Sequence, residues 1–416
     1  MKSLDDWLEY IGAVHPTSID LGLERVLRVA ERLDVVRDAG RTLIVAGTNG
    51  KGSTSIFAEN LLRAAGYRVG TTLSPHLHRF NERIRIDGDC ASDADICASL
   101  ARVDAARGEA SLTYFEFAIL AALSAFKQAE VDVRVLEVGL GGRLDAVNVC
   151  DPDVSVITNV GIDHQHFLGN DRDSIGREKA GVLRADVPAI VGELEPPTSV
   201  LAMAEQLGTP LYRLGREFTF SQDDDGWGFR GQFADRTLEM TNLPMPGVAL
   251  VNAATALAAV TALRVELSPQ KVRCAAGRPG LPGRLDVREV DGRVLVFDVA
   301  HNVLGGEFVA SQLRERKLRP QCAVAGFLQD KDVLGIVASL EETVGHWLFV
   351  DTHGERGQSA AQSFRKSGLT GERGTVIADI DKALERSAQA ADCTLVLGSF
   401  DVVERARQRV EAACRI

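Results

Sequence analysis

The sequence lacks the features of several protein classes. Its seven cysteines lie far apart and include no C-x-x-C pair, which argues against a disulfide framework and a structural zinc site. No apolar run approaches the length of a membrane span, since the longest candidate, Phe117–Phe126, contains a serine and is typical of a buried helix. The first six residues turn acidic too early for a secretory signal. We therefore expect a cytoplasmic protein with no membrane partner.

Basic residues are also in the minority. The chain has 47 Lys and Arg against 58 Asp and Glu, a formal net charge of -11. Nucleic-acid binding requires clustered Lys and Arg, so we expect no nucleic-acid partner. Hydrophobic residues make up 45% and charged residues 25%, as in an ordinary globular protein, and 416 residues suffice for two or three domains.

Strand-like and helix-like segments alternate in the first half of the chain. The first strand-like run, residues 41–46, enters a glycine-rich turn, and a helical pattern follows from Ser53 to Ala65. Further strand-like runs lie at residues 67–73, 131–138, 154–158 and 187–191, and helix-like segments at residues 94–106 and 115–129. This alternation predicts an α/β fold with a mostly parallel sheet covered by helices on both faces.

The second half contains a change of pattern and a linker. Within residues 212–245, the acidic turn Asp223–Gly226 lies between aromatic runs. This pattern predicts a small antiparallel β segment. The segment Gly277–Gly283 places six Gly, Pro or Arg residues around one leucine, which is typical of a linker. A second alternating series follows, with strand-like runs at residues 294–297, 322–325, 347–350, 375–378 and 394–397. We therefore expect two domains, residues 1–283 and 284–416, the second a smaller Rossmann-like α/β domain.

The glycine-rich turn, Gly47–Ser53, resembles a phosphate-binding loop. Glycines let backbone N–H groups approach phosphate oxygens, and a helix N-terminus and Lys51 offset their charge. The match to the general pattern is imperfect, because Val45 occupies the first glycine position and Gly52 stands where Ser or Thr normally holds magnesium. Ser53 could take that role. A tight strand–helix turn without a ligand is the alternative.

Three further polar residues lie near the carboxyl ends of predicted strands: Glu137 within its strand, and Ser74 and His164 after theirs. The carboxyl ends of parallel strands form the edge at which α/β folds bind ligands. Oxygen ligands suit Mg²⁺, whereas no ligands with zinc spacing accompany His164 and His166. From the residues alone, each of the three could equally be a turn, capping or surface residue.

Many motifs together resemble the bifunctional dihydrofolate synthase/folylpolyglutamate synthase family of the Mur ligase superfamily. The loop Gly47–Ser53 is similar to that of the superfamily, and the glycine after Lys51 points to its folate branch. Other matching motifs run along almost the whole chain: residues 74–77, 81–84, 113–116, 137–145, 163–164, 178–181, 252–255, 281–284, 298–302, 330–332 and 398–400.

The resemblance implies a P-loop ATPase domain of Mur-ligase type with the folate site, followed by a C-terminal glutamate-ligase domain. It implies an ATP-dependent ligase that adds L-glutamate to dihydropteroate and to reduced folates through an acyl phosphate. ATP and two Mg²⁺ ions would be required, and we expect a monomer that acts on small molecules. Three alternatives remain: a folylpolyglutamate synthase only, another Mur-type amino-acid ligase, or a regulatory P-loop ATPase.

The resemblance also implies roles for individual residues. The implied metal ligands are Ser53, Ser74, Glu137, His164 and Lys179, the last as a carbamate on a residue that we expect to open a helical stretch. The implied catalytic residues are Lys51, Lys179 and His301. The implied nucleotide contacts are Thr48, Asn49, Gly50, Lys51, Gly52, Ser53, Asn252, Arg284 and Asp298. The implied dihydropteroate contacts are Asp20, Leu21, Gly22, Leu23, Thr113, Tyr114, Phe115, Glu116, Leu144, Asp145 and Ala146.

Two positions depart from the family pattern. Val303 replaces the proline that usually follows Ala-His-Asn, and Glu355 stands where a proline is common. Both departures bear on loop geometry and glutamate-chain preference in the second domain, and neither bears on the ATP chemistry.

Overall fold

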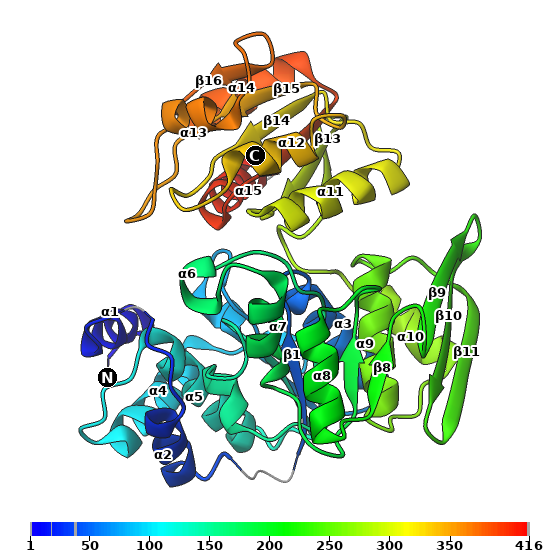
Figure 1. Ribbon diagram of the computed structural model, residues 1–416. Coiled ribbons are helices and arrows are strands. Elements are labelled where there is room, and N and C mark those ends of the chain that lie inside the picture. The colour runs from blue at the N-terminus through cyan, green and yellow to red at the C-terminus, as the bar shows by residue number, and fades with distance from the viewer. Residues whose placement is uncertain (1, 18, 37–39, 414–416) are drawn as a thin grey trace. The chain divides into compact units, whose positions relative to one another are not determined.

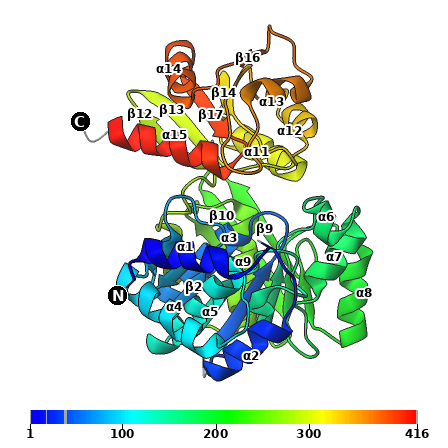
Figure 2. The ribbon, with the colours of Figure 1, turned by 90° about the vertical axis from the view of Figure 1, so that its left-hand side faces the viewer.

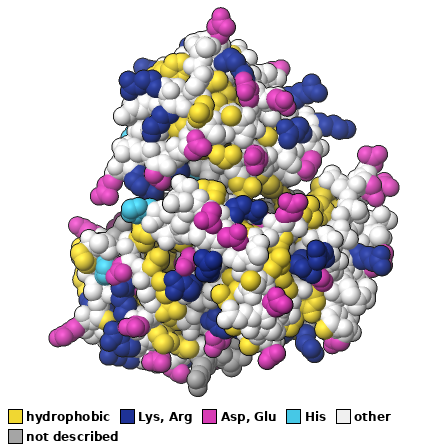
Figure 3. Space-filling view, in the orientation of Figure 1, with side chains coloured by type: hydrophobic (Ala, Val, Ile, Leu, Met, Phe, Trp, Pro, Cys, Tyr) yellow, Lys and Arg dark blue, Asp and Glu magenta, His cyan; other side chains and the backbone are white. Residues whose placement is uncertain are grey.

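The computed structural model describes residues 2–17, 19–36 and 40–413. The chain divides into two compact units, Met1–Gly280 and Leu281–Ile416, each an α/β structure (Figure 1). Within the described residues, no helix is both long enough and apolar enough to cross a membrane. On the face shown in Figure 3, side chains of both charge signs are interspersed.

The first unit is built on an eight-stranded sheet with the order β4-β3-β2-β5-β1-β6-β7-β8. All neighbouring strands are parallel except at one edge, where β3 and β4 form an antiparallel hairpin beside β2. The mostly parallel sheet predicted from the sequence is thus confirmed. Its strands are β1 (Arg41–Ala46), β2 (Val69–Thr72), β3 (Ile84–Ile86), β4 (Asp89–Cys90), β5 (Val133–Glu137), β6 (Val154–Ile157), β7 (Ala189–Val191) and β8 (Leu211–Arg213).

Successive side chains of the central strand β1 enter different hydrophobic cores, because side chains alternate between the two faces of a sheet. Leu43 and Val45 pack with α3 (Lys51–Ala64), α9 (Leu250–Ala262) and α10 (Pro269–Ala276). Ile44 and Ala46 enter the core on the opposite face, whose helices face the viewer in Figure 2. These helices are α1 (Leu4–Val14), α2 (Glu24–Arg32), α4 (Asp93–Arg107) and α5 (Tyr114–Gln128).

Three helices and a small sheet complete the unit. The helices α6 (Gln165–Leu168), α7 (Arg172–Ala180) and α8 (Thr198–Leu207) follow β6 and β7, and α7 and α8 share a core with these strands. The predicted antiparallel β segment is the three-stranded sheet β11-β10-β9. Its aromatic residues, among them Trp227, pack into the same core as α9. Its strands are β9 (Phe218–Asp223), β10 (Gly226–Phe233) and β11 (Arg236–Leu243).

The second unit is built on a six-stranded sheet with the order β12-β13-β17-β14-β15-β16, in which only β12 is antiparallel to its neighbour. The predicted α/β character is confirmed. The strands are β12 (Asp286–Val290), β13 (Arg293–Asp298), β14 (Cys322–Ala325), β15 (His346–Phe349), β16 (Gly374–Val376) and β17 (Cys393–Leu397). The helices are α11 (Val303–Glu315), α12 (Val333–Ser339), α13 (Ala360–Ser367), α14 (Ile380–Ala390) and α15 (Phe400–Ala413).

Candidate active site

The loop between β1 and α3 depends on two glycines. Gly47 and Gly50 have φ angles of +147° and +79°, which side chains rarely allow. A Cβ atom at Gly47 would lie 1.8 Å from the hydroxyl of Thr158, and one at Gly50 would lie 2.5 Å from the side-chain oxygen of Asn252. Asn252, a predicted nucleotide contact in the first turn of α9, therefore lies against this loop. The loop leads directly into α3, whose first N–H groups have no partners within the helix and suit a phosphate.

The segment after β6 fixes the shape of this loop. The backbone N–H of Thr48 donates to the carbonyl oxygen of Asn159 at 2.9 Å, and that of Asn49 donates to the Asn159 side chain at 3.0 Å. The Thr48 hydroxyl accepts from the N–H of Gly161 at 2.9 Å. Sequence analysis gave Asn159 no role, because only the pairing of β1 with β6 brings these segments together.

Two lysines converge on the loop. The Nζ atoms of Lys51 and Lys179 donate to the carbonyl oxygen of Gly47, at 3.2 and 2.8 Å. The expectation that Lys179 opens a helix is wrong, since it lies in the last turn of α7. That helix begins seven residues earlier, at Arg172, and its N-cap Asp171 forms a capping box with Ser174.

Lys179 has the charge environment of a readily deprotonated amine. Its side chain is buried. The pKa of Lys179 is lowered from 10.5 to about 7, first by burial and then by the positive charge of Lys51. The negative charges of Asp163, Asp145 and Glu193 act in the opposite direction. A neutral amine is therefore accessible near neutral pH.

Ser74 and Glu137 form a second part of the site, at the carboxyl ends of β2 and β5. The backbone N–H of Ser74 donates to Glu137 at 2.8 Å, and Glu137 pairs in register with Val45 just before the loop. The hydroxyl oxygen of Ser74 is buried, and among the described residues it has no hydrogen-bond partner. A carboxylate beside an unpartnered buried hydroxyl fits a hard cation such as Mg²⁺.

The remaining predicted metal ligands are Ser53, His164 and Lys179. Ser53 is buried in the first turn of α3, and His164 is exposed at the N-cap of α6, with a left-handed φ of +50°. An ammonium on Lys179 can only donate, so Lys179 fits a metal only if its chemistry changes. In the described part of the chain, no three His, Cys, Asp or Glu side chains are grouped as metal ligands.

The predicted dihydropteroate contacts from two distant segments lie together. A Cβ atom at Gly139 would lie 2.5 Å from the ring of Phe115 and 3.2 Å from the carboxylate of Asp145. Asp145 is buried and accepts from the N–H groups of Leu140 and Val147, at 2.8 and 3.1 Å. Burial raises its pKa to about 6, against these hydrogen bonds and the charge of Lys51. Leu144 and Ala146 flank Asp145 in the chain. Because the charge of Lys51 acts on Asp145, the predicted dihydropteroate contacts around Asp145 lie near the phosphate loop.

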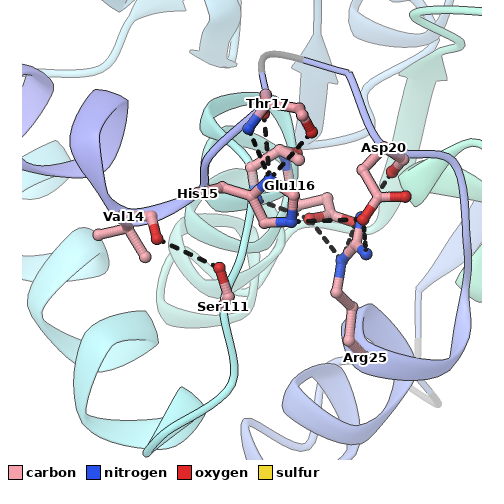
Figure 4. Close-up of polar contacts among 8 residues, drawn as sticks. Val14, His15, Thr17, Asp20, Arg25, Ser111 and Glu116 are labelled. Carbon is pink, nitrogen blue, oxygen red and sulfur yellow. Dashed lines mark hydrogen bonds and ion pairs between the residues drawn. The ribbon is translucent and has the colours of Figure 1, made fainter.

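An arginine joins a third predicted segment to this group. Arg25 lies between Asp20 and Glu116 and pairs with both carboxylates (Figure 4). Its Nε donates to both oxygens of Glu116, at 2.9 and 3.0 Å, while the N–H of Thr113 donates to Glu116 at 2.7 Å. Leu21, Gly22 and Leu23 are partly buried between Asp20 and α2, and Tyr114 begins α5. Glu116 therefore holds two segments in place, and its direct contact with a substrate stays a prediction.

In the second unit, three predicted residues gather at the carboxyl end of β13. The carboxylate of Asp298 accepts from the N–H groups of Leu285 and Ala300, both at 2.8 Å. Burial raises the pKa of Asp298, while Arg284 acts to lower it. Arg284 lies over the ring of Phe400, 4.9 Å from its centre, and the Nδ1–H of His301 donates to a carbonyl oxygen at 2.8 Å.

The two departures from the family pattern fall at tolerant positions. Val303 is the first residue of α11, where a backbone N–H needs no partner within the helix, so proline and valine are both accepted. The N-cap Asn302 still accepts from the N–H of Gly305, at 2.8 Å. Glu355 is exposed in the loop between β15 and α13.

Comparison with known proteins agrees with this geometry. The Mur ligase middle domain matches residues 45–185, and the Mur ligase glutamate ligase domain matches residues 283–400. The dihydrofolate synthase/folylpolyglutamate synthase of Escherichia coli (strain K12) is 44% identical over 98% of this chain and 96% of the relative. The chain belongs to the dihydrofolate synthase/folylpolyglutamate synthase family of Mur ligases.

Solved structures of this family are also similar over the whole length. E. coli FolC in complex with DHPP and ADP has a TM-score of 0.93 and 41% identity, and the match covers 99% of each chain. The bifunctional enzyme of Yersinia pestis CO92, complexed with AMPPNP and Mn ion, has a TM-score of 0.91 and 43% identity, over 100% of this chain and 99% of that one. The Mur ligase fold expected from the sequence is thus confirmed for this family member.

Sequence analysis missed several residues of this Mur ligase site. Asp163 and Glu193 act on the charge of Lys179, and both follow sheet strands, β6 and β7. Their position after strands was a usable signal. Asp163 even belongs to a matching motif, but neither residue received a role.

Proposed function

We propose that the protein is an ATP-dependent ligase that adds L-glutamate to dihydropteroate, forming dihydrofolate, and to reduced folates, forming polyglutamates. The observation that carries this proposal is the 44% identity, over 98% of the chain, to an enzyme named for both activities. The site agrees, since the phosphate loop, Glu137 and the predicted pterin contacts form connected parts of one unit. The matched glutamate ligase domain supports glutamate as the amino acid.

A carboxylate does not condense with an amine in water, so ATP must first convert it to an acyl phosphate. A carboxylate oxygen bonds to the γ-phosphorus, and ADP leaves with the electron pair of the broken bond. The glutamate amine then attacks the acyl carbon, and phosphate leaves. Lys51 and the N–H groups at the start of α3 suit the transferring phosphoryl oxygens, where positioning and charge stabilisation supply most of the catalysis.

We further propose two Mg²⁺ ions. Ser74 and Glu137 would hold the first with Ser53, and His164 and a carbamate on Lys179 would hold the second. Bound Mg²⁺ offsets charge on phosphate oxygens. The observation in favour is the unpartnered hydroxyl of Ser74 beside Glu137. For Lys179 it is the lowered pKa, because carbamate formation from carbon dioxide requires a neutral amine.

The proposed roles in the second unit concern the nucleotide and glutamate. Arg284 and Asp298 would contact the nucleotide, and His301 would orient the acyl phosphate or glutamate from the carboxyl end of β13, where its Nδ1–H donates to a carbonyl oxygen. Asn252 would contact the nucleotide from its place against the phosphate loop. We propose that one chain acts alone on these small molecules in the cytoplasm.

Glutamate-dependent phosphate release from ATP tests this function. Purified protein is assayed with dihydropteroate, tetrahydrofolate and a UDP-muramyl substrate, each with and without L-glutamate. Release with the first two substrates supports the dual activity. Release with tetrahydrofolate alone reduces the function to a folylpolyglutamate synthase, and release with the UDP-muramyl substrate indicates another Mur ligase. Release that does not depend on glutamate indicates a regulatory ATPase.

A further inference from the structure

Arg83 is a partly buried arginine that has no part in the proposed metal and nucleotide contacts. Its carbonyl oxygen accepts from the N–H of Leu73, which places it beside the strand end that carries Ser74. Its guanidinium carbon lies 5.6 Å from the ring centre of Tyr114 and 5.9 Å from that of Phe80. Its Nε donates to Nδ1 of His76 at 2.7 Å.

The bond to His76 fixes the direction of the guanidinium. An arginine Nε–H can only donate, so Nδ1 of His76 must be the unprotonated nitrogen of the ring. Nε is held in this way, and the two terminal NH₂ groups of Arg83 form no hydrogen bond to a described residue. The rings of Phe80 and Tyr114, which meet edge to face, restrict the plane of the fork further.

Within the described residues Arg83 forms no ion pair, although the carboxylates of Glu137 and Glu82 lie close enough to act on its charge. The adjacent Glu82 accepts from the N–H groups of Leu77, His78 and Arg79 instead. By contrast, Arg25 at the other end of the predicted folate segments pairs with two carboxylates (Figure 4). A desolvated cation without a partner is costly, and such a residue in a candidate site suggests an anionic ligand.

The position of Arg83 indicates which anion. Tyr114, against which it lies, belongs to a predicted pterin-binding segment. Burial lowers the pKa of Arg83, and the charges of Tyr114 and of Glu137, a predicted metal ligand, act in the opposite direction, so both lie near the guanidinium. Arg83 therefore lies between the pterin end and the phosphate end of the site. The carboxylate of a pteroyl substrate has to reach this region to attack the γ-phosphate.

We propose that Arg83 binds the reacting carboxylate of the pteroyl substrate, and that His76 is the positioning residue that aims its guanidinium. The proposal rests on the function proposed above. A guanidinium fork matches a carboxylate with two parallel hydrogen bonds. When a carboxylate oxygen bonds to the γ-phosphorus and ADP leaves, Arg83 keeps its proton and its bonds pass to the acyl phosphate oxygens.

A pair of ligands tests this directly. Dihydropteroate is compared with the same molecule lacking only its carboxyl group, and the dissociation constant of each is measured by calorimetry. In the unmodified protein the carboxyl group should improve binding by about 10- to 100-fold, as expected for a charge-assisted pair. In Arg83→Ala that advantage should disappear, while the analogue without the carboxyl group binds about as before. Arg79→Ala is the matched control, because Arg79 is exposed and pairs with Asp93. This variant should still bind dihydropteroate more tightly than the analogue without the carboxyl group.

Kinetics separate this role from a structural one. Arg83→Ala should raise the KM for dihydropteroate and lower kcat, with the KM for ATP unchanged, and Arg83→Lys should recover part of the loss. His76→Ala should show a milder version of the same pattern. If Arg83→Ala does not fold, the ligand pair is measured on Arg83→Lys, where the advantage should shrink.

Two different results would contradict this proposal. One concerns the role of Arg83 alone, and the other concerns the proposed function of the whole protein. A carboxyl advantage that stays undiminished in folded Arg83 variants overturns the role of Arg83 alone. Absence of glutamate-dependent phosphate release in the unmodified protein with either folate substrate overturns the proposed function itself.

Discussion

The side-chain amines of Lys51 and Lys179 share one acceptor, the carbonyl oxygen of Gly47, at 3.2 and 2.8 Å. Two ammonium groups held against one carbonyl repel each other, and the charge of Lys51 accordingly lowers the pKa of Lys179. The arrangement favours loss of the proton from the more deeply buried amine. This contact therefore gives the phosphate loop one charged lysine, Lys51, and one lysine that readily loses its proton, Lys179.

Lys179 should carry a carbamate. Its neutral amine can react with carbon dioxide, which replaces a cation by an oxygen-bearing anion that suits magnesium. Carbon-13 NMR of protein equilibrated with labelled bicarbonate should show a carbamate signal that is absent from Lys179→Ala. That variant should be severely impaired and partly restored by small carboxylates. Lys127→Ala, which removes a more exposed lysine paired with Asp34, should keep the signal. A fully active Lys179→Ala without any signal in the parent would return Lys179 to a structural role.

The stability of the metal-free, bicarbonate-free protein should rise with pH because of Lys179. Its pKa is 10.5 in the unfolded chain and about 7 in the folded one. Between these values the unfolded chain binds a proton that the folded chain does not, so the free energy of unfolding increases by up to about 1.4 kcal/mol per pH unit. Urea unfolding at pH 7, 8 and 9 should show this rise in the parent and in Lys127→Met but not in Lys179→Met. Equal slopes in all three proteins would mean that Lys179 stays protonated.

Ser74→Ala should separate metal binding from folding. The Ser74 hydroxyl is buried and unpartnered among the described residues, so its removal should change the free energy of unfolding by no more than about 1 kcal/mol. The Mg²⁺ concentration needed for half-maximal activity should increase about 10-fold, as for loss of one polar contact to a metal. A Mg²⁺ titration of the variant that overlays that of the parent would remove Ser74 from the metal site.

Lys51→Ala should lower turnover by about 100-fold or more while the protein stays folded, because it removes a charge from the transferring phosphoryl group. Thermal unfolding and steady-state phosphate release measure the two effects. Lys127→Ala provides the control for loss of a lysine outside the site. Near-normal turnover and nucleotide affinity in Lys51→Ala would show that the loop is only a turn between β1 and α3.

The central strands and the phosphate loop could be predicted because their signals are local. The run Leu43–Ala46 before Gly47 is apolar, as expected for a strand buried on both faces, and the loop motif itself lies within seven residues. The hairpin of β3 and β4 was missed because strands of three and two residues carry no periodic pattern.

The charge environment of the site could not be predicted, because it depends on contacts between distant segments. Lys179 is buried by packing of α7 against the loop after β1, and the spacing around residue 179 carries no trace of this contact. Asn159 likewise has no sequence signal for its role, and Arg83, although it lies in the matching motif 81–84, received none. Their partners, His76 and Thr48, are identified only by the folded backbone.

The proposed ligase reaction proceeds through an acyl phosphate, and transfer of a carboxylate oxygen to phosphate reveals this intermediate. Dihydropteroate with both carboxyl oxygens replaced by oxygen-18 is incubated with the protein, ATP, Mg²⁺ and L-glutamate. The released phosphate is then analysed by mass spectrometry. The carboxylate oxygen that attacks the γ-phosphorus leaves with the phosphate, so each released phosphate should contain one oxygen-18 atom, and dihydrofolate should form in equal amount. Phosphate without oxygen-18 would show that water, not the substrate carboxylate, attacks ATP, and would contradict the account.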